Sequence, residues 1–353
     1  MAHDGPACTR LSAFVRYSSC AAWQSCTFNL LPAGIAAALA MLPLPVQAQA
    51  QAQAQAWPQR PVRIIVPQSP GGSTDMMARL LAARLGEGLG QPVLIDNRPG
   101  AGSVVGTEVA VRASPDGYTT LVVSSSITIN PSMHAKLSFD PQRDLAPITQ
   151  LSAFPNVLAA NMAFPVKTVQ ELLTLSKARP GKIAYSSAGS GTGTHLSAEL
   201  FKNLTGADLL HVPYKGGGPS VNALLAGETQ ISFATLPSVL SHIRGGKLRA
   251  LGVTTTRRSF ALPDVPTIVE GGVAGYEHVQ WTGFLAPAGT PAPVIARLNA
   301  ESVRAVHSAE MKPILAGEGA EPVGNTPQQF AAIIRSETQR IAQVVRKAGI
   351  KAD

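Results

Sequence analysis

The sequence predicts an α/β protein with two doubly wound lobes joined by a two-segment hinge. Three observations support this fold class. Short β-branched runs alternate with helical patterns from Trp57 onward, the same alternation restarts after Phe154, and two extended segments without helical period could connect the two units. Alternating strands and helices are typical of a parallel sheet that carries helices on both faces.

The first unit begins with the strand "PVRIIVP" and the helix "TDMMARLLAARLGEGLG", in which Met77, Leu81 and Leu85 keep a helical spacing. The strand "QPVLIDN", the helix "GSVVGTEVAVRA" and the strand "YTTLVVSS" follow. In the second unit, "TVQELLTLSKA" is a helix with Thr168 as N-cap and Glu171 three residues on. The runs "KIAYSSA", "LLHVPY", "TQISFAT" and "LRALGVTT" are strands with helices between them. The chain ends in two helices, of which the last has Thr326 as its N-cap.

The segments "LAPITQLSAFPNVLAAN" and "YEHVQWTGFLAPAG" are the expected hinge. They place residues 57–155 plus 276–353 in lobe 1 and residues 156–275 in lobe 2. A ligand of such a protein binds in the crevice at the carboxyl ends of the strands.

Residues 1–56 read as a signal peptide and a Gln-Ala linker. An apolar run, "FNLLPAGIAAALAMLPLPV", precedes "QAQAQAQAQA", which offers cleavage sites between Ala48 and Ala56. We therefore expect the chain to be exported. All three cysteines precede the cleavage zone, so the exported chain would have neither a disulfide nor a reactive thiol.

Composition limits the classes of function. The 353 residues are 45% hydrophobic and 14% charged, which is typical of a globular chain with a large core. The net charge of +8 favours attraction of anionic small molecules. Nucleic acid is not an expected partner, because there is no run of basic residues and aromatic residues make up only 5%. We expect a monomer.

The stretch "YSSAGSGTGTHLSAEL" has the order of strand, glycine loop and helix. No Gly-Lys-Ser/Thr follows, so it is not a phosphate loop of that class. Asp208 precedes the next strand, whereas a ribose-binding acid would follow that strand, which counts against a dinucleotide. A carboxylate fits better, since a helix N-terminus offers free N–H groups and glycines let an anion approach the backbone.

Three more loops resemble it: "VPQSPGGSTDMMARL", "VPYKGGGPSVN" and "SSSITINPS". Each alone could be an ordinary turn. Four such loops over two lobes favour a cleft that binds a polyanion or a dipolar acid. The expected ligand-binding residues are Ser69, Gly71, Gly72, Ser73, Thr74, Asp75, Ser126, Asn130, Ala188, Gly189, Ser190, Gly191, Thr192, Thr194, His195, Tyr214, Lys215 and Gly216.

The alternative is an exported hydrolase-like enzyme in the same α/β cleft. Ser190 and His195 could suggest a nucleophile and a base, but no G-x-S-x-G elbow and no orienting acid are found. A histidine in a first helical turn is also compatible with packing or capping. The sequence has no metal-ligand spacing and no cofactor motif. We therefore expect a protein that is not an enzyme and that binds no metal and no cofactor. Trp281 is expected to be a hinge or core aromatic.

Ordered motifs along the chain carry a resemblance to a known family. They include "WPQRPVRIIVPQSPGGSTDMMAR", "VLIDNRPGAGSVVGTEVA", "NPSM", "YSSAGSGTGTHLSAELF", "HVPYKGGGPSVNALLAGE" and "GYEHVQWTGFLAPAGTP". From Trp57 to Ile350 the chain resembles the Bug-type extracytoplasmic solute receptors of tripartite tricarboxylate transporters. The resemblance implies a periplasmic binding protein of the type II, Venus-flytrap form. It also implies that one ligand carboxylate lies between residues 69–75 and 189–195, with residues 214–218 selecting the distal end.

The resemblance further implies a small organic acid as ligand and the transporter's membrane subunits as partners. Two departures bear on the ligand, because Gln230 and Ala234 stand where the family usually has acids. Fewer acids disfavour a cationic group, so a di- or tricarboxylate is expected rather than an amino acid. An orphan receptor used in signalling remains an alternative to transport.

Overall fold

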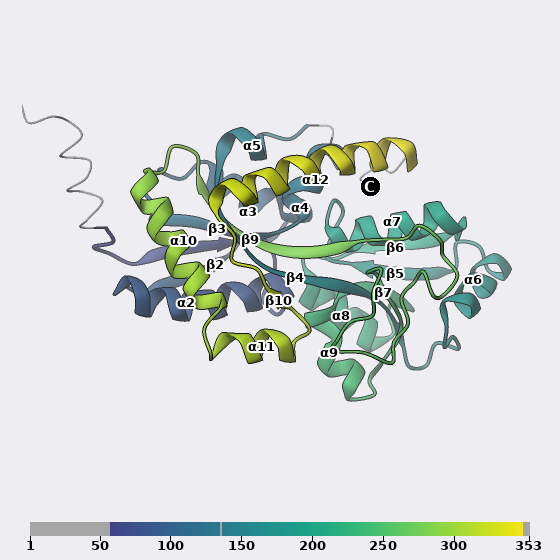
Figure 1. The fold of residues 1–353 in the computed structure, drawn as a ribbon. Helices are drawn as coiled ribbons and strands as arrows, with labels where there is room; N and C mark the ends of the chain where they lie inside the picture. The colour runs from purple at the N-terminus through teal and green to yellow at the C-terminus, as the bar shows by residue number, and fades with distance from the viewer. Residues whose placement is uncertain (1–56, 135, 349–353) are drawn as a thin grey trace, which may run out of the picture. The chain divides into compact units, whose positions relative to one another are not determined.

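The computed structural model describes residues 57–134 and 136–348. The expected signal peptide and Gln-Ala linker, residues 1–56, lie outside these described residues. Figure 1 shows a single mixed sheet with helices packed around it. Among the described residues, no helix combines the length and the apolar character needed to cross a membrane.

The first half of the sheet has three parallel strands at its edge, in the order β2-β1-β3. Strand β9 then pairs antiparallel with β3. The elements of this half in chain order are β1 (Val62–Val66), α2 (Ser73–Leu89), β2 (Val93–Asn97), the 3-10 turn η1 (Ala101–Ser103), α3 (Val104–Val111), β3 (Thr119–Ser124), α4 (Ser126–Met133) and α5 (Pro141–Asp144).

The second half repeats this plan, with parallel strands in the order β6-β5-β7. Its elements are α6 (Val169–Ala178), β5 (Ile183–Ser187), α7 (Gly193–Thr205), β6 (Leu209–Pro213), α8 (Gly217–Ala226), β7 (Ile231–Thr235), α9 (Leu236–Arg244) and β8 (Leu248–Val253). Thr168 accepts a hydrogen bond from the backbone N–H of Glu171, which confirms the predicted N-cap of α6.

Two long strands join the halves, and both lie in the segments that the sequence predicts as the hinge. Strand β4 (Leu145–Asn161) pairs with β9 (Val279–Pro287) through Pro155, and with β7 from Asn156 onward. Figure 1 shows β4 and β9 side by side through the middle of the sheet. The antiparallel pairing was not predicted, because local sequence does not specify partners so distant in the chain. The lobe boundaries themselves stay a prediction.

The last part of the chain returns to the first half of the sheet. It contains α10 (Ala292–Val306), α11 (Met311–Gly317), β10 (Glu321–Pro322) and α12 (Pro327–Ala348). Gln329 donates its N–H to the Thr326 hydroxyl, which confirms the predicted N-cap of α12. In a separate small cluster, Ile341 and Val345 of α12 pack with Ile129 of α4 and Leu196 of α7.

Apolar side chains cover both faces of each half of the sheet. In the first half, Ile64 packs in the cluster on one face and Ile65 in the cluster on the other. In the second half, Leu158 and Val157 alternate in the same way. Burial on both faces is what the continuous apolar runs of the strands predict for a doubly wound sheet.

One local prediction was wrong: the segment "SSSITINPS" was expected to be a loop, but residues 126–133 form helix α4. Ile127, Ile129 and Met133 are buried and favour the helix through packing. Pro131 lies in the second half of this short helix, which ends two residues later at Met133. The change matters for the site, since a helix fixes the direction of the Asn130 side chain.

Candidate functional site

The loop before α2 and the first residue of α2 contact the loop before α8 and helix α9 across the two lobes. The backbone N–H of Ser69 donates to the carbonyl of Lys215 at 3.0 Å, and the N–H of Ser73 donates to the Ser238 hydroxyl at 3.1 Å. A Cβ atom added at Gly72 would lie 3.3 Å from the backbone nitrogen of Gly217. Glycine at these positions therefore allows the two lobes to approach backbone to backbone.

The loop before α2 is held in shape by a buried carboxylate. Asp75 accepts hydrogen bonds from the N–H of Gly71, from Arg79 and from Asn97, each at 3.0 Å. Burial raises the pKa of Asp75, but the hydrogen bonds from Arg79, Asn97 and Gly71 outweigh it and hold the pKa below its ordinary value of 3.8. These three partners make Asp75 a brace of the loop, and direct contact with a ligand stays a prediction.

The loop before α7 is held by neutral groups. The Thr194 hydroxyl accepts from the N–H of Ala188 at 2.9 Å, and the Thr192 hydroxyl donates to the carbonyl of Gly189 at 2.6 Å. The N–H of Gly191 donates to Nδ1 of His195 at 3.2 Å. His195 is 1% exposed and its ring stacks on His211 with centroids 4.3 Å apart. This geometry supports a packing and capping role for His195 rather than a catalytic one.

A cavity of about 440 Å³ lies between the lobes beside these contacts. Its walls come from the loops after β1, β2, β5 and β6, at the carboxyl ends of the parallel strands, and from the end of α4. The residues that line it are Pro67, Gly100, Ala101, Gly102, Ser103, His134, Ala188, Gly189, Ser190, Pro213, Tyr214 and Lys215.

Five of the predicted ligand-binding residues line this cavity: Ala188, Gly189, Ser190, Tyr214 and Lys215. Among the other predicted residues, Ser69 and Ser73 donate to the second lobe, and hydrogen bonds within the two loops involve Gly71, Asp75, Gly191, Thr192, Thr194 and His195. Ser126 bonds with Ser124, and the Thr74 hydroxyl has no partner among the described residues. The roles of all these residues in ligand binding stay predictions.

Sequence reasoning left out the wall formed by residues 100–103. The stretch "RPGAGS" follows strand β2 and contains two glycines with positive φ, Gly100 at 142° and Gly102 at 59°. It has the same order of strand, glycine loop and helix as the loops that were included, so the signal was present. A Cβ atom at Gly102 would overlap the carbonyl oxygen of Ser190, so only glycine allows this approach between the lobes.

The cavity is electrostatically suited to an anion. Lys215 is the one formally charged residue in its described lining, which contains no carboxylate. Burial lowers the pKa of His134 below its ordinary value of 6.5, so the imidazole is neutral at neutral pH. Burial, together with the hydrogen bond from its hydroxyl to Glu228, raises the pKa of Tyr214, which therefore stays protonated and neutral.

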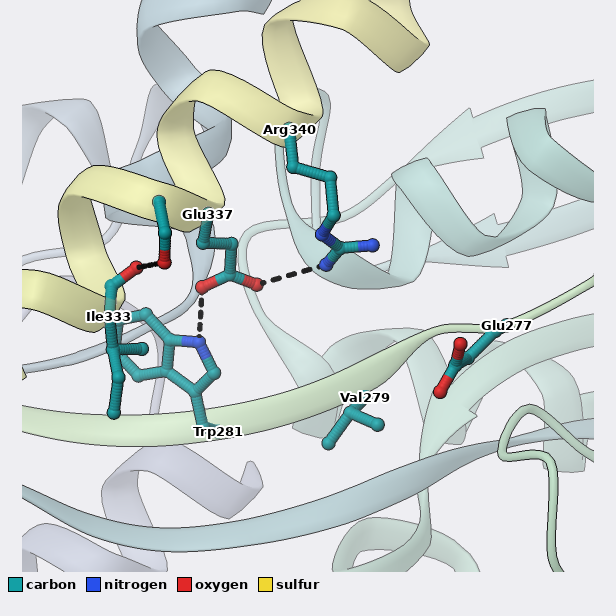
Figure 2. Close-up of a pocket in the computed structure, with 7 residues that line it drawn as sticks. Glu277, Val279, Trp281, Ile333, Glu337 and Arg340 are labelled. Carbon is teal, nitrogen blue, oxygen red and sulfur yellow. Dashed lines mark hydrogen bonds and ion pairs between the residues drawn. The ribbon is translucent and has the colours of Figure 1, made fainter.

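A second cavity of about 400 Å³ lies between β9 and α12, away from the predicted loops (Figure 2). Trp281 donates from Nε1 to Oε2 of Glu337 at 2.6 Å, and Arg340 lies 3.7 Å from the other carboxylate oxygen. Burial raises the pKa of Glu337, and the bond from Trp281 and the charge of Arg340 only partly offset this. Trp281 is 3% exposed on a strand that joins the lobes, which supports its interpretation as a hinge or core aromatic.

Within the described ranges, no group of three or more His, Cys, Asp or Glu side chains could hold a metal ion. His195 has an acid nearby, because its Nε2 lies 3.9 Å from Glu199, but the Nδ1 side of the ring faces the N–H of Gly191 and not the Ser190 hydroxyl.

Comparison with known proteins places the chain in a family. The family model described as "Tripartite tricarboxylate transporter family receptor" matches residues 77–350. The chain is 40% identical over 297 residues to Protein BugT of Bordetella pertussis, covering 84% of this chain and 91% of that one.

Solved structures give the same result. A structure from R. palustris with adipate has a TM-score of 0.81 and 36% identity, and the match covers 83% of this chain and 99% of that chain. MatC from Rhodopseudomonas palustris with bound malate has a TM-score of 0.79 and 32% identity, over 82% of this chain and 100% of that chain. The predicted resemblance and the predicted two-lobed periplasmic binding protein fold are confirmed. The chain belongs to the tripartite tricarboxylate transporter receptor family.

Proposed function

We propose that this protein is a non-catalytic periplasmic receptor that captures a small organic acid and delivers it to the membrane subunits of a tripartite tricarboxylate-type transporter. The observation that carries this proposal is the cavity between the lobes, where glycine loops, among them the loop that precedes α7, meet Lys215 and no carboxylate belongs to the described lining. Backbone N–H groups at a helix N-terminus favour an anion, and Lys215 adds a full positive charge.

The size of the cavity and the relatives support the same class of ligand. A volume of about 440 Å³ lies within the range of small-molecule sites. Two relatives were solved with adipate and malate, which are both dicarboxylates. One carboxylate of such a ligand would be held at the glycine loops and the other near Lys215.

Capture would depend on closure of the two lobes around β4 and β9. A ligand shifts this equilibrium only by the contacts that it makes in the closed form and not in the open form. On this proposal, the contacts of Ser69 with Lys215 and of Ser73 with Ser238 would break on opening, and ligand bonds from both lobes would add to them on closure.

Calorimetry and thermal unfolding of the exported protein test the binding proposal. Succinate, malate and adipate are the probes, and the diamide of succinate is the uncharged control. A ligand at 100 times its Kd should stabilise the native protein by about 2.7 kcal/mol. Lys215→Met should weaken dicarboxylates about tenfold or more, because it removes the cavity's charged group. No binding by any of the acids, or equal binding by the diamide, would contradict the proposal.

Uptake measurements test the delivery step separately. Cells without this receptor should lose uptake of the acid that binds, and the wild-type gene should restore it. Restoration by Lys215→Met at low acid concentration would contradict delivery through this cavity. We further propose that the receptor acts as a monomer, which light scattering of the exported protein would check.

A further inference from the structure

A small apolar cluster is formed by helices from both lobes. Its buried members are Ile129 and Met133 of α4, Leu196 of α7, and Ile341 and Val345 of α12. Helices α4 and α12 belong to lobe 1 in the division that the sequence predicts, and α7 belongs to lobe 2. Figure 1 shows the last turns of α12 extending over α7, so this helix reaches from one lobe to the other.

Leu196 is the one residue of lobe 2 among the buried members of the cluster, and it is 2% exposed. On the same helix, Ala198 and Phe201 pack instead in the core of lobe 2, and Leu200 packs against both clusters. Residues two and five places apart lie on roughly opposite faces of a helix with 3.6 residues per turn. Helix α7 therefore presents one face to its own lobe and Leu196 to the other lobe.

The cluster lies outside the ligand cavity, because none of its buried residues belongs to the described lining of that cavity. It is nevertheless connected to the lining on both sides. His134 directly follows α4, and Ser190 belongs to the loop that precedes α7. A change in the cluster can therefore affect a bound acid only through the positions of the helices, and not through a contact with the acid.

Opening of the lobes would separate α7 from α4 and α12 and return Leu196 to water. Removing apolar surface from water is favourable, so the cluster stabilises the arrangement in which these helices meet. A contact shifts an equilibrium between two arrangements only when it differs between them. The contacts of Leu196 cross between the lobes and meet this condition, whereas those of Phe201 stay within lobe 2.

We propose that Leu196 and the end of α12 form a latch that holds the receptor closed even without a ligand. Leu196 is then a positioning residue, which raises the affinity for the acid without touching it. A receptor whose binding-competent form is already populated loses less affinity to the conformational change. The effect on affinity rests on the proposed function, while the effect on the ligand-free arrangement does not.

Small-angle X-ray scattering of the exported protein tests the latch. The protein is unfolded and refolded to remove bound metabolites, and its radius of gyration is measured without ligand and with malate. The wild-type radius should be nearly the same in both cases. Leu196→Ala and Ile341→Ala, one in each lobe, should increase the ligand-free radius, because each removes part of the cluster. Variants that keep the wild-type radius, or a wild-type protein that contracts with malate as much as the variants do, would overturn the proposal.

Phe201→Leu is the matched control on the same helix. Phe201 is fully buried in the core of lobe 2, so this variant should lower the melting temperature but leave the ligand-free radius unchanged. An equal increase of the radius in Phe201→Leu would mean that any loosening of α7 opens the lobes. That result would overturn the assignment to the contact between the lobes.

Calorimetry with malate, succinate and adipate measures the consequence for binding. Both latch variants should weaken each acid that binds the wild-type protein by about tenfold, with the ratios between the acids unchanged. Phe201→Leu should retain the wild-type affinities. Wild-type affinities in both latch variants would overturn the proposal. If none of the three acids binds the wild-type protein, the proposed function fails, and the scattering of the ligand-free variants still decides whether the latch exists.

Discussion

The loops at the beginning of α2 and α7 share one order of strand, glycines and helix, yet different chemistry holds each in shape. In the first loop, the carboxylate of Asp75 accepts three hydrogen bonds, and the N-cap Gly72 has no capping side chain. In the second loop, the Thr194 hydroxyl and the His195 ring accept hydrogen bonds from backbone N–H groups, and Thr192 caps the helix.

The difference shows that the same order of strand, glycines and helix can be held in shape with or without a buried charge. A carboxylate inside the first loop is tolerated because Arg79 and two N–H donors compensate it. The second loop is free of acid among its described residues and leaves the positive end of α7 unopposed. We therefore expect the second loop to contribute more to holding an anionic ligand and the first loop to respond more to loss of charge.

The largest expected effect is the loss of folding stability in acid. A histidine near the second loop and the carboxylate of the first loop should cause this loss in different pH ranges. His278 precedes β9, and its Nε2 lies 3.4 Å from Gln280, which packs against Gly193 at the start of α7. Burial lowers the pKa of His278 to about 4, despite the hydrogen bond with Gln280. A folded pKa below the unfolded value of 6.5 means that stability is complete above pH 6.5 and is lost as the pH falls toward 4. The loss should be about 3 kcal/mol.

Urea unfolding between pH 4 and pH 7.5 measures this loss, and His278→Gln should flatten the profile by a similar amount. Asp75 titrates in a separate window, because its lowered pKa confines its effect to pH values below about 3.8. Glu337 acts in the opposite direction, since its raised pKa makes the folded protein gain stability as it is protonated. An unchanged profile in His278→Gln would show that His278 is not the titrating group.

Gly191→Ala should give the next largest effect, and its larger part should fall on ligand binding. Gly191 has a φ of 78°, and an added Cβ would lie 2.6 Å from Oδ1 of Asn130 on the other lobe. Overpacking of this kind costs about 1–3 kcal/mol and would act only when the lobes close. We expect affinity for the acid to fall about 100-fold.

Gly206→Ala is the matched control for this variant. Gly206 has a similar φ of 69°, but nothing lies within 4 Å of an added Cβ. Both variants should lose about 1–2 kcal/mol of stability from the left-handed backbone. Calorimetry should show weakened binding for Gly191→Ala alone, and equal affinities would argue against closure at this point.

Sequence reasoning was most successful where a feature is local. The strands, the helix from Ser73 to Leu89 and the cap at Thr168 follow from periodicity and from residues three or four apart. The wall at residues 100–103 and the place of His134 in the cavity lining depend on which turns meet in space. That depends on the order of strands in the sheet and on the antiparallel pairing of β4 with β9, which local patterns do not specify.

Asp75→Asn tests the charged brace of the first loop. The variant keeps the shape of the side chain but removes the charge and turns a donor toward the partners of Asp75, so we expect a loss of about 2 kcal/mol in urea unfolding at pH 7. Arg79→Gln removes only the half-exposed partner and should cost less than about 1 kcal/mol. Equal losses would mean that the ion pair, and not the buried bonds from Gly71 and Asn97, supports the loop.

Thr192→Val is the corresponding change in the second loop and should have the smallest effect, about 1 kcal/mol. Valine keeps the shape of threonine but removes the hydroxyl that donates to Gly189 and caps the N–H of His195. Thr192→Ser retains that hydroxyl and should recover most of the loss in the same urea experiment. Several neutral hydrogen bonds stabilise this loop. Removing one of them should therefore lower the free energy of unfolding by less than removing the single carboxylate of the first loop. A larger loss for Thr192→Val than for Asp75→Asn would reverse the comparison and make the hydroxyl network the stronger brace.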